Sequence, residues 1–262
     1  MTSCSSYMDE EPVVAGIPDE IKIEVSVADA ASRAGYTSAN LDKIDLVIFN
    51  NVNPDFSYSA VCSKVGMSWM ADKSMAWDQA RSTVSVAAVA PSRGLSSLST
   101  LSISVPAFYG AESDVKNADF LLMRRDIDPK ADLTADGKLP ISLSHMLSKF
   151  TIDFGGAEVS SVKVEGTVLT GKCNLRREPA TVEVSDDMPL AIAPFKTARG
   201  TYECMIVPQT AAKLTVTFRA GGHKYRWTPS GEVTFAPNTA YTLPLSVSAV
   251  GEAKGQMRKA RY

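Results

Sequence analysis

Two histidines, His145 and His223, are the residues in this sequence best suited to acid–base chemistry, and they lie far apart along the chain. His145 stands in "LSHMLSKFTIDF", where a short amphipathic turn meets a strand-like run, and His223 follows two glycines in a hairpin-like turn. An imidazole can act as a general acid or base. It can equally fill a core position if it is hydrogen-bonded. The two uses stay open for His145 at this point, and nothing in the sequence supports a catalytic pair.

Nucleophile and phosphate-binding signatures are missing from the sequence. It has no G-x-S-x-G elbow, no C-x-x-C pair, no G-x-x-x-x-G-K-[ST] loop and no G-x-G-x-x-G turn after a strand. The four cysteines, Cys4, Cys62, Cys173 and Cys204, are scattered, which is typical of small buried hydrophobic residues rather than metal or redox sites. We therefore expect no enzymatic activity and no cofactor, with a small hydrolase as a residual alternative.

Three aspartates, Asp128, Asp132 and Asp136, precede Gly137 and superficially resemble a calcium loop. Their spacing of four residues does not match the alternate-residue ligands of an EF-hand, and no glutamate closes the loop. The sequence therefore predicts no metal site.

Trp69 and Trp77 flank a methionine-rich segment and could do either of two things. Their rings could form a platform for a ligand, which requires an accessible ring face. They could instead fill irregular core space together with methionine, which is the commoner use. We expect them mainly in the core or rim of the first domain.

Composition excludes several classes of protein. With 27 basic and 29 acidic residues the net charge is −2, so the chain has no overall positive field to hold nucleic acid. No apolar run approaches the roughly 20 residues that span a bilayer.

Short runs of alternating apolar and polar residues dominate the chain and predict half-buried strands. They include the segments 21–27, 83–89, 160–169, 181–185, 214–218 and 243–249, and a buried strand core at 44–49. Turn-forming clusters separate them. Segments 95–101 and 143–150 are the only short helical candidates. This pattern favours an all-β protein built of sandwiches.

The charged, proline-bearing stretch 124–140 is the best internal boundary. We therefore expect a leader at 1–19, an N-terminal sandwich at 20–139, a C-terminal sandwich at 140–250 and a polar tail at 251–262. The "MTSC" before an acidic stretch looks like the end of a bacterial lipobox, which would make Cys4 the lipidated residue. A cysteine near the start by chance is the alternative.

Taken in order, "MTSC", "IKIEVSV", "IDLVIFN", "VSVAAVAP", "NADFLLMRRDI", "SHMLSKFTIDF", "YECMIVPQT" and "VTFAPNTAYTLPLSV" resemble the fimbrillin family, the type V pilin-like surface lipoproteins of Gram-negative anaerobic bacteria. The resemblance covers most of the chain. It implies that His145 is a packing residue in the turn where the second domain begins. It implies two transthyretin-like Greek-key β-sandwich domains and export as a lipoprotein to the outer membrane and cell surface. It also implies assembly with other fimbrial subunits by β-strand exchange, and adhesion to host or bacterial surface ligands.

The resemblance further implies that an arginine-specific protease cuts between Arg33 and Ala34 and releases the first strand. In that strand Ile21, Ile23, Val25 and Val27 alternate with polar residues, so one face suits an apolar groove. The tail after Val250 is too polar to be a good donor strand. An accessory, tip or anchor subunit therefore fits better than a shaft pilin, and the alternative is a free-standing lipoprotein that binds carbohydrate or protein.

Overall fold

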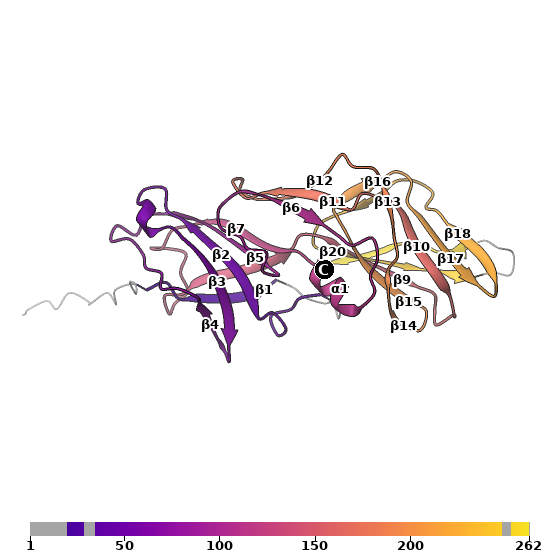
Figure 1. Ribbon diagram of the computed structural model, residues 1–262, viewed down its shortest axis with the longest axis horizontal. Helices are drawn as coiled ribbons and strands as arrows, with labels where there is room; N and C mark the ends of the chain where they lie inside the picture. Colours follow the sequence, from indigo (N-terminus) through magenta and orange to yellow (C-terminus); the bar gives the residue numbers. More distant parts are fainter. Residues whose placement is uncertain (1–19, 29–34, 248–252, 262) are drawn as a thin grey trace, which may run out of the picture.

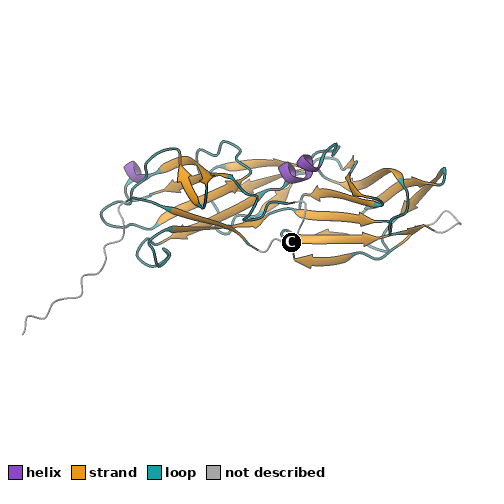
Figure 2. Cartoon of the chain, turned by 90° about the horizontal axis from the view of Figure 1, so that it is seen from below, coloured by secondary structure: helices purple, strands orange, loops and turns teal. Residues whose placement is uncertain are grey.

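The computed structural model describes residues 20–28, 35–247 and 253–261, and it is an elongated molecule made almost entirely of strands (Figures 1 and 2). Within these ranges the helical elements are one α-helix, α1 (Glu112–Ala118), and one 3-10 turn (Pro54–Phe56). The predicted all-β class is confirmed. Both predicted helical segments are wrong, because 95–101 leads into strand β6 (Thr100–Ser104) and 143–150 spans parts of β8 (Leu139–His145) and β9 (Ser148–Asp153).

Seven strands form one sheet in the N-terminal part, in the order β1-β8-β7-β5-β2-β3-β4. Besides β8 they are β1 (Ile23–Val27), β2 (Lys43–Phe49), β3 (Tyr58–Val65), β4 (Ser68–Ala71), β5 (Val84–Ala90) and β7 (Leu121–Ile127). All pairs are antiparallel except β1 with β8, which is parallel. The strands predicted at 21–27, 44–49 and 83–89 are confirmed as β1, β2 and β5.

This sheet curls so that its two edge strands approach each other. Just before β1, Glu20 forms an antiparallel bridge with Ala76, and the amide of Ile21 donates to the carbonyl of Met75 at 2.8 Å. Ile44, Leu46 and Ile48 of β2 face the enclosed core, while Val47 packs into a second core on the opposite face. Burial on both faces explains why this strand reads as a continuous apolar run instead of an alternating one.

Fourteen further strands follow β9 and make smaller sheets. They are β10 (Ser160–Thr167), β11 (Thr170–Asn174), β12 (Val182–Val184), β13 (Leu190–Ile192), β14 (Phe195–Ala198), β15 (Thr201–Ile206), β16 (Gln209–Ala211), β17 (Thr215–Ala220), β18 (His223–Trp227), β19 (Val233–Phe235), β20 (Thr239–Pro244), β21 (Ser246–Val247), β22 (Ala253–Lys254) and β23 (Arg258–Arg261). The two larger sheets have the orders β14-β15-β9-β20-β23 and β13-β10-β17-β18.

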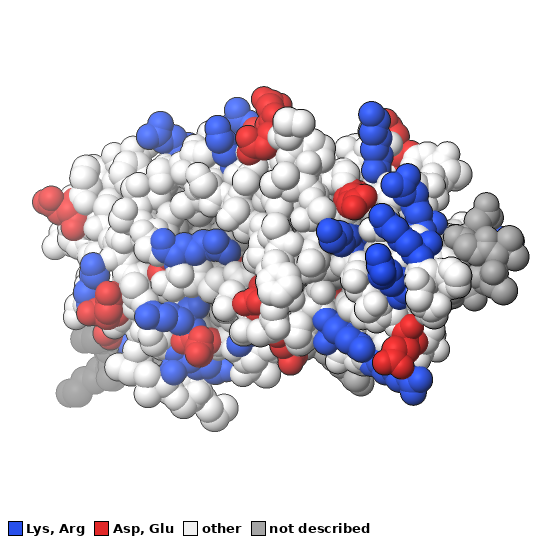
Figure 3. Space-filling model, turned by 45° about the vertical axis from the view of Figure 1, so that its right-hand side comes forward, with Lys and Arg blue, Asp and Glu red and all other residues white. Residues whose placement is uncertain are grey.

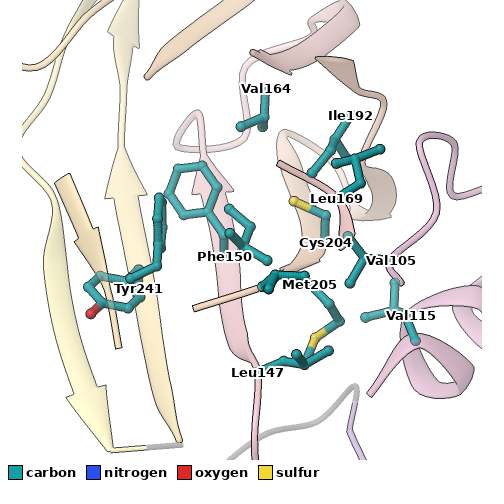
Figure 4. Packing of buried hydrophobic residues seen from close by; sticks show 14 of the residues in the cluster. Val105, Val115, Leu147, Phe150, Val164, Leu169, Ile192, Cys204, Met205 and Tyr241 are labelled. Atoms are coloured by element: carbon teal, nitrogen blue, oxygen red, sulfur yellow. The ribbon is translucent and has the colours of Figure 1, made fainter. Parts of the chain in front are cut away.

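The second core lies between these two larger sheets (Figure 4). Phe150 and Cys204 come from the five-stranded sheet and meet Val164 and Ile192 from the four-stranded sheet. The opposite face of β15 is buried as well, because Met205 packs in the same cluster as Val115 of α1 and Val105. Alternation within β15 therefore places buried residues on both faces of the strand.

The described residues form two clusters of buried residues, and the predicted boundary at 139/140 does not separate them. Strand β8 begins there and pairs with β1 and β7, so it belongs to the first sheet. Strand β6 pairs with β11, and residues between 103 and 122 pack in the second core. The charged stretch before β8 connects two paired strands of one sheet, so it has the polar composition of a linker without being one.

The predicted polar tail contributes strands to the fold. β23 pairs antiparallel with β20, and β22 pairs with β21. In β23 the side chains of Arg258, Lys259 and Ala260 are exposed, so backbone pairing and not apolar burial holds β23.

Candidate functional site

Strand β1 presents the alternation that the sequence predicts. Ile21, just before the strand, and Ile23 are each 6% exposed, Val27 is 9% exposed, and all three belong to the first core. Val25 is half-buried against that core, while Lys22, Glu24 and Ser26 face solvent. At about 1.5–3 kcal/mol for each fully buried side chain, burial of the three aliphatic residues supplies most of the force that holds β1 in place.

Only one described strand pairs with β1 along its length. Its parallel partner is β8, in a register that runs from Ile23 opposite Leu139 to Val27 opposite Leu143. On the other edge, the amide of Val27 donates to the side-chain oxygen of Ser38 at 2.8 Å. β1 is therefore an edge strand, and the backbone groups on its outer side could pair with another strand.

A groove of about 780 Å³ runs between β1 and β4. Its lining includes Lys22, Glu24 and Lys64, so charges of both signs surround it, together with Trp69 and Met70. The β3–β4 hairpin beside it carries exposed apolar side chains at Val65, Met67 and Met70. Sequence reasoning noticed the methionines but missed their exposure. The signal in the sequence was Gly66, because glycine is the usual residue in a tight turn. In the structure its φ is +63°, and the turn exposes Met67.

The two tryptophans occupy different environments. Trp77 is 5% exposed and lies in the first core, so in this conformation it has no open ring face for a ligand. Trp69 is half-buried, packs against the same core and lines the groove. Of the two, Trp69 alone keeps the accessibility that a stacking platform needs.

Three other predicted site residues, Cys4, Arg33 and Ala34, lie outside the described residues. The chain is firmly held on each side of the segment 29–34. Before it, the amide of Ala28 donates to the carbonyl of Leu143 at 2.8 Å. After it, the amide of Tyr36 donates to Oδ2 of Asp119 at 3.2 Å, and Tyr36 is itself buried.

The carboxylate of Asp119 also pairs with His145. This contact bears on whether His145 serves chemistry or packing. Nδ1 of His145 lies 2.9 Å from Oδ2 and 3.1 Å from Oδ1 of Asp119, and both side chains are fully buried. The pair connects the end of β8 to the approach to β7 and to the chain at Tyr36. The other histidine, His223, is exposed in the β17–β18 hairpin of a different sheet. The structure thus gives His145 a packing and anchoring role, and sequence reasoning missed its partner.

The loop with the three aspartates is stabilised internally. The amide of Asp128 donates to Oδ2 of Asp132, whose other oxygen lies 2.9 Å from Arg125, and Asp136 pairs with Lys138. Among the residues that the structure describes, no group of three or more His, Cys, Asp or Glu side chains is arranged to hold a metal ion. The same ranges contain no helix that is both long and apolar enough to cross a membrane.

Three cysteines within the described ranges, Cys62, Cys173 and Cys204, are free thiols and fully buried. Burial raises the pKa of the Cys62 thiol to about 12 and that of Cys173 to about 11. Because the thiolate is the reactive form, these side chains are inert packing residues at neutral pH.

Comparisons with known proteins agree with this architecture. A structure from Bacteroides uniformis, described as a candidate cell adhesion protein, aligns with a TM-score of 0.66 at 16% identity over 92% of this chain and 97% of its own. A fimbrial protein from Bacteroides vulgatus gives 0.55 at 12% identity, over 91% and 98%. The tip fimbrial protein Mfa3 from Porphyromonas gingivalis gives 0.55 at 8% identity, over 85% and 94%. At these identities the likeness shows a shared fold.

No curated protein sequence gives a match. Residues 28–258 match the family model described as Fimbrillin-like, which is most of the chain. The name of this family and the descriptions of the three structures refer to fimbriae or cell adhesion, and none of them describes an enzyme. This chain belongs to the fimbrillin-like family.

Proposed function

We propose that this protein is a subunit of cell-surface fimbriae that assembles by β-strand exchange at the groove of β1 and mediates adhesion. The observation that carries the proposal is the state of β1. It is an edge strand with one paired neighbour, an apolar face in the first core and an open groove on its other side. A strand held in this way can be replaced by a strand from a partner that offers the same alternation.

Proteolysis would act on the segment that joins β1 to the rest of the chain. A cut between Arg33 and Ala34 leaves Val27 paired with β8 and Tyr36 held by Asp119. The cut therefore removes the covalent tether without disturbing either anchor. β1 then stays only through its pairing and its burial, and a partner strand can compete for the same place.

The exposed apolar residues of the β3–β4 hairpin support a partner on this side of the molecule. Met67 is fully exposed and Met70 is 59% exposed, next to the groove. Single exposed apolar residues are ordinary, but several beside an open strand edge favour contact with another chain. A donor strand that fills the groove would cover them.

We propose an accessory, tip or anchor position in the fimbrium and a lipid anchor at Cys4 in the outer membrane. The tail supports the first point, since β23 pairs with β20 of its own chain and carries exposed Arg258 and Lys259. A strand with such side chains has no apolar face to insert into the groove of another subunit.

The test uses Cys62 as a reporter of the core that β1 covers. Folded protein carrying Cys4→Ser is cut with an arginine-specific protease under limiting conditions and treated with a thiol reagent. We expect Cys62 to react after the cut when a competing strand or a low concentration of urea displaces β1, while Cys204 of the second core stays protected. The matched control is Arg33→Ala, which resists the cut.

Assembly is then followed by light scattering with other fimbrial subunits from the native host. The cut protein should form larger species and the Arg33→Ala protein should not. A cut protein that stays monomeric with every subunit, or unchanged fimbriation in a native strain carrying Arg33→Ala, would overturn strand exchange at this site.

The second candidate function is a free-standing surface lipoprotein that binds carbohydrate or protein, and Trp69 is the observation in its favour. Its half-buried ring lines the groove next to exposed methionines. Under this proposal Trp69→Ala abolishes glycan binding and leaves the assembly of the cut protein unchanged. Loss of assembly with no effect on any glycan would favour the first function.

A further inference from the structure

The far end of the molecule from β1 carries a concentration of positive charge. Residues 1–145 contain 12 Lys and Arg against 19 Asp and Glu, whereas residues 146–262 contain 15 against 10. Figure 3 shows basic side chains gathered over the C-terminal end of the molecule, with few acidic ones among them. The near-neutral total thus hides a basic C-terminal part.

Four of these basic residues share one face of the four-stranded sheet, and we call this set the cationic face. Lys163 on β10, Thr217 on β17 and Arg226 on β18 lie opposite one another across the three strands. In the next row Arg219 lies directly opposite Lys224. All four cations, Lys163, Arg219, Lys224 and Arg226, are exposed, while alternate residues of the same strands fill the second core.

This arrangement works against stability. Like charges directly opposite each other in an antiparallel pair are destabilising, and Arg219 and Lys224 stand in that relation. Within the described ranges no carboxylate lies within 4.0 Å of the four cationic groups. The acid that shares the face, Glu165, is half-buried and lies two residues after Lys163, opposite Thr215. Four cations without a carboxylate partner among the described residues suggest an anionic partner.

We propose that the cationic face binds an extended anionic polysaccharide, that is, a polymer with regularly repeated sulfate or carboxylate groups. From the spacing of strands, Arg219 and Lys224 stand about 5 Å apart, and Lys163 and Arg226 stand about 10 Å apart with Thr217 between them. The two pairs form two parallel rows about 7 Å apart. Rows of this kind suit a linear chain of anions. Binding draws on charge and hydrogen bonding alone, so it is strongest at low salt.

The chemistry of the face favours a polysaccharide over the other anionic partners. A protein interface usually has an apolar, partly aromatic centre, but the residue between Lys163 and Arg226 is Thr217, and the adjoining row holds Glu165 and Thr215. Single-stranded nucleic acid is held by stacking on aromatic side chains. The aromatic residues of β18, Tyr225 and Trp227, are buried on the opposite face.

This inference deepens the adhesion role of the proposed function and rests on it only for its biological setting. It needs neither the cut at Arg33 nor a partner subunit. It is therefore tested on uncut monomer, so that loss of polysaccharide binding and loss of assembly are separate results.

The experiment measures binding of the full chain to dextran sulfate and to polygalacturonate by calorimetry between about 50 and 200 mM salt, with neutral dextran as the ligand control. We expect binding to at least one of the two charged polymers that weakens as salt rises, and none to neutral dextran. The test variant is Lys224→Gln with Arg226→Gln. If each of the two lost cations contributes as much binding free energy as a basic residue does at an anionic membrane surface, affinity falls about 30-fold.

The matched control is Lys43→Gln with Lys130→Gln, which changes the net charge equally at exposed positions of the N-terminal part. This control should bind within about twofold of the unchanged protein. Thermal melting of the test variant should not fall, because Lys224→Gln relieves the repulsion with Arg219. A melting temperature that stays constant ensures that lost binding reports on the face and not on unfolding.

Three results would overturn the proposal. The first is that neither charged polymer binds at about 50 mM salt. The second is that the two double variants lose affinity equally, which would mean a general charge effect. The third is binding of equal strength, with the same loss in the test variant, to vesicles containing one-third phosphatidylserine, in which case the partner is an anionic lipid surface.

Discussion

β1 and β23 are both edge strands near the ends of the chain, yet different forces hold them. β1 pairs in parallel with β8 and buries Ile23 and Val27 in the first core. β23 pairs antiparallel with β20 and exposes Arg258 and Lys259. The first strand is bound by an apolar face that any similar strand could supply, and the second by backbone pairing with a charged exterior. Edge position alone therefore does not make a strand exchangeable.

The exposed basic side chains of β23 are suited to protecting this sheet edge. An uncovered edge is a template for unwanted pairing, and basic side chains on the outer strand are a common protection against it. Gly255 fixes the approach to this strand, because a Cβ there would collide with the carbonyl oxygen of Pro244. The carbonyl of Gly255 also accepts a hydrogen bond from Nε1 of Trp227 at 3.1 Å. The tail is thus docked at a defined position and shields the edge of the second sandwich.

The largest expected effect comes from the core that β1 covers. Trp77→Ala removes a buried indole from this core and should lower the free energy of unfolding by about 3–5 kcal/mol. Trp69→Ala, in the half-buried rim, should cost clearly less. Urea unfolding of the two variants provides the measurement. Equal losses would contradict the assignment of the two rings to core and rim.

The next effect tests β1 itself. Ile23→Ala should cost about 2–3 kcal/mol, the lower part of the usual range, because an edge strand can relax around the lost volume. Glu24→Ala, one position along on the exposed face, should change the free energy of unfolding by less than about 0.5 kcal/mol. Both variants are compared by urea unfolding at pH 7. If they lose the same amount, apolar burial is not what holds β1.

A third prediction uses the pKa of the Cys62 thiol, which burial raises to about 12. An unfolded thiol titrates near 8.5. Because the folded pKa lies above the unfolded one, the contribution of Cys62 to stability is complete below about pH 8.5. It is lost as the pH rises toward 12. The urea midpoint of the Cys62→Ala variant, measured from pH 7 to 10.5, should decline less steeply than that of the unchanged protein, and parallel curves would refute this assignment.

The smallest effect on stability is expected at β23. Arg258→Thr with Lys259→Thr should change the free energy of unfolding by less than about 0.5 kcal/mol, because both side chains are exposed. The same variant should associate more readily in light scattering, because the edge loses its protecting charge. Unfolding by several kcal/mol would instead show that β23 resembles β1 in what holds it.

How well the sequence predicted the structure depended on the range over which each signal acts. Strands with one mainly buried face, such as β1 and β10, were predicted because a period of two reports that burial. α1 was missed because its buried face comprises only Val115 and Ala118, too few for a helical period. The stretch 124–140 was misread as a linker, because local composition does not distinguish a hairpin connection from a domain boundary.

For the candidate site, the sequence by itself determined that β1 has an apolar face, that Cys62, Cys173 and Cys204 are packing residues, and that the molecule is all-β. These properties follow from side-chain chemistry and its local period. Only the tertiary structure decided that β1 lies at an edge beside β4, that Asp119 receives both His145 and Tyr36, and that Arg219 stands opposite Lys224. Each of these depends on strand register or on contact between distant segments, and the chain fixes those only when the whole core closes.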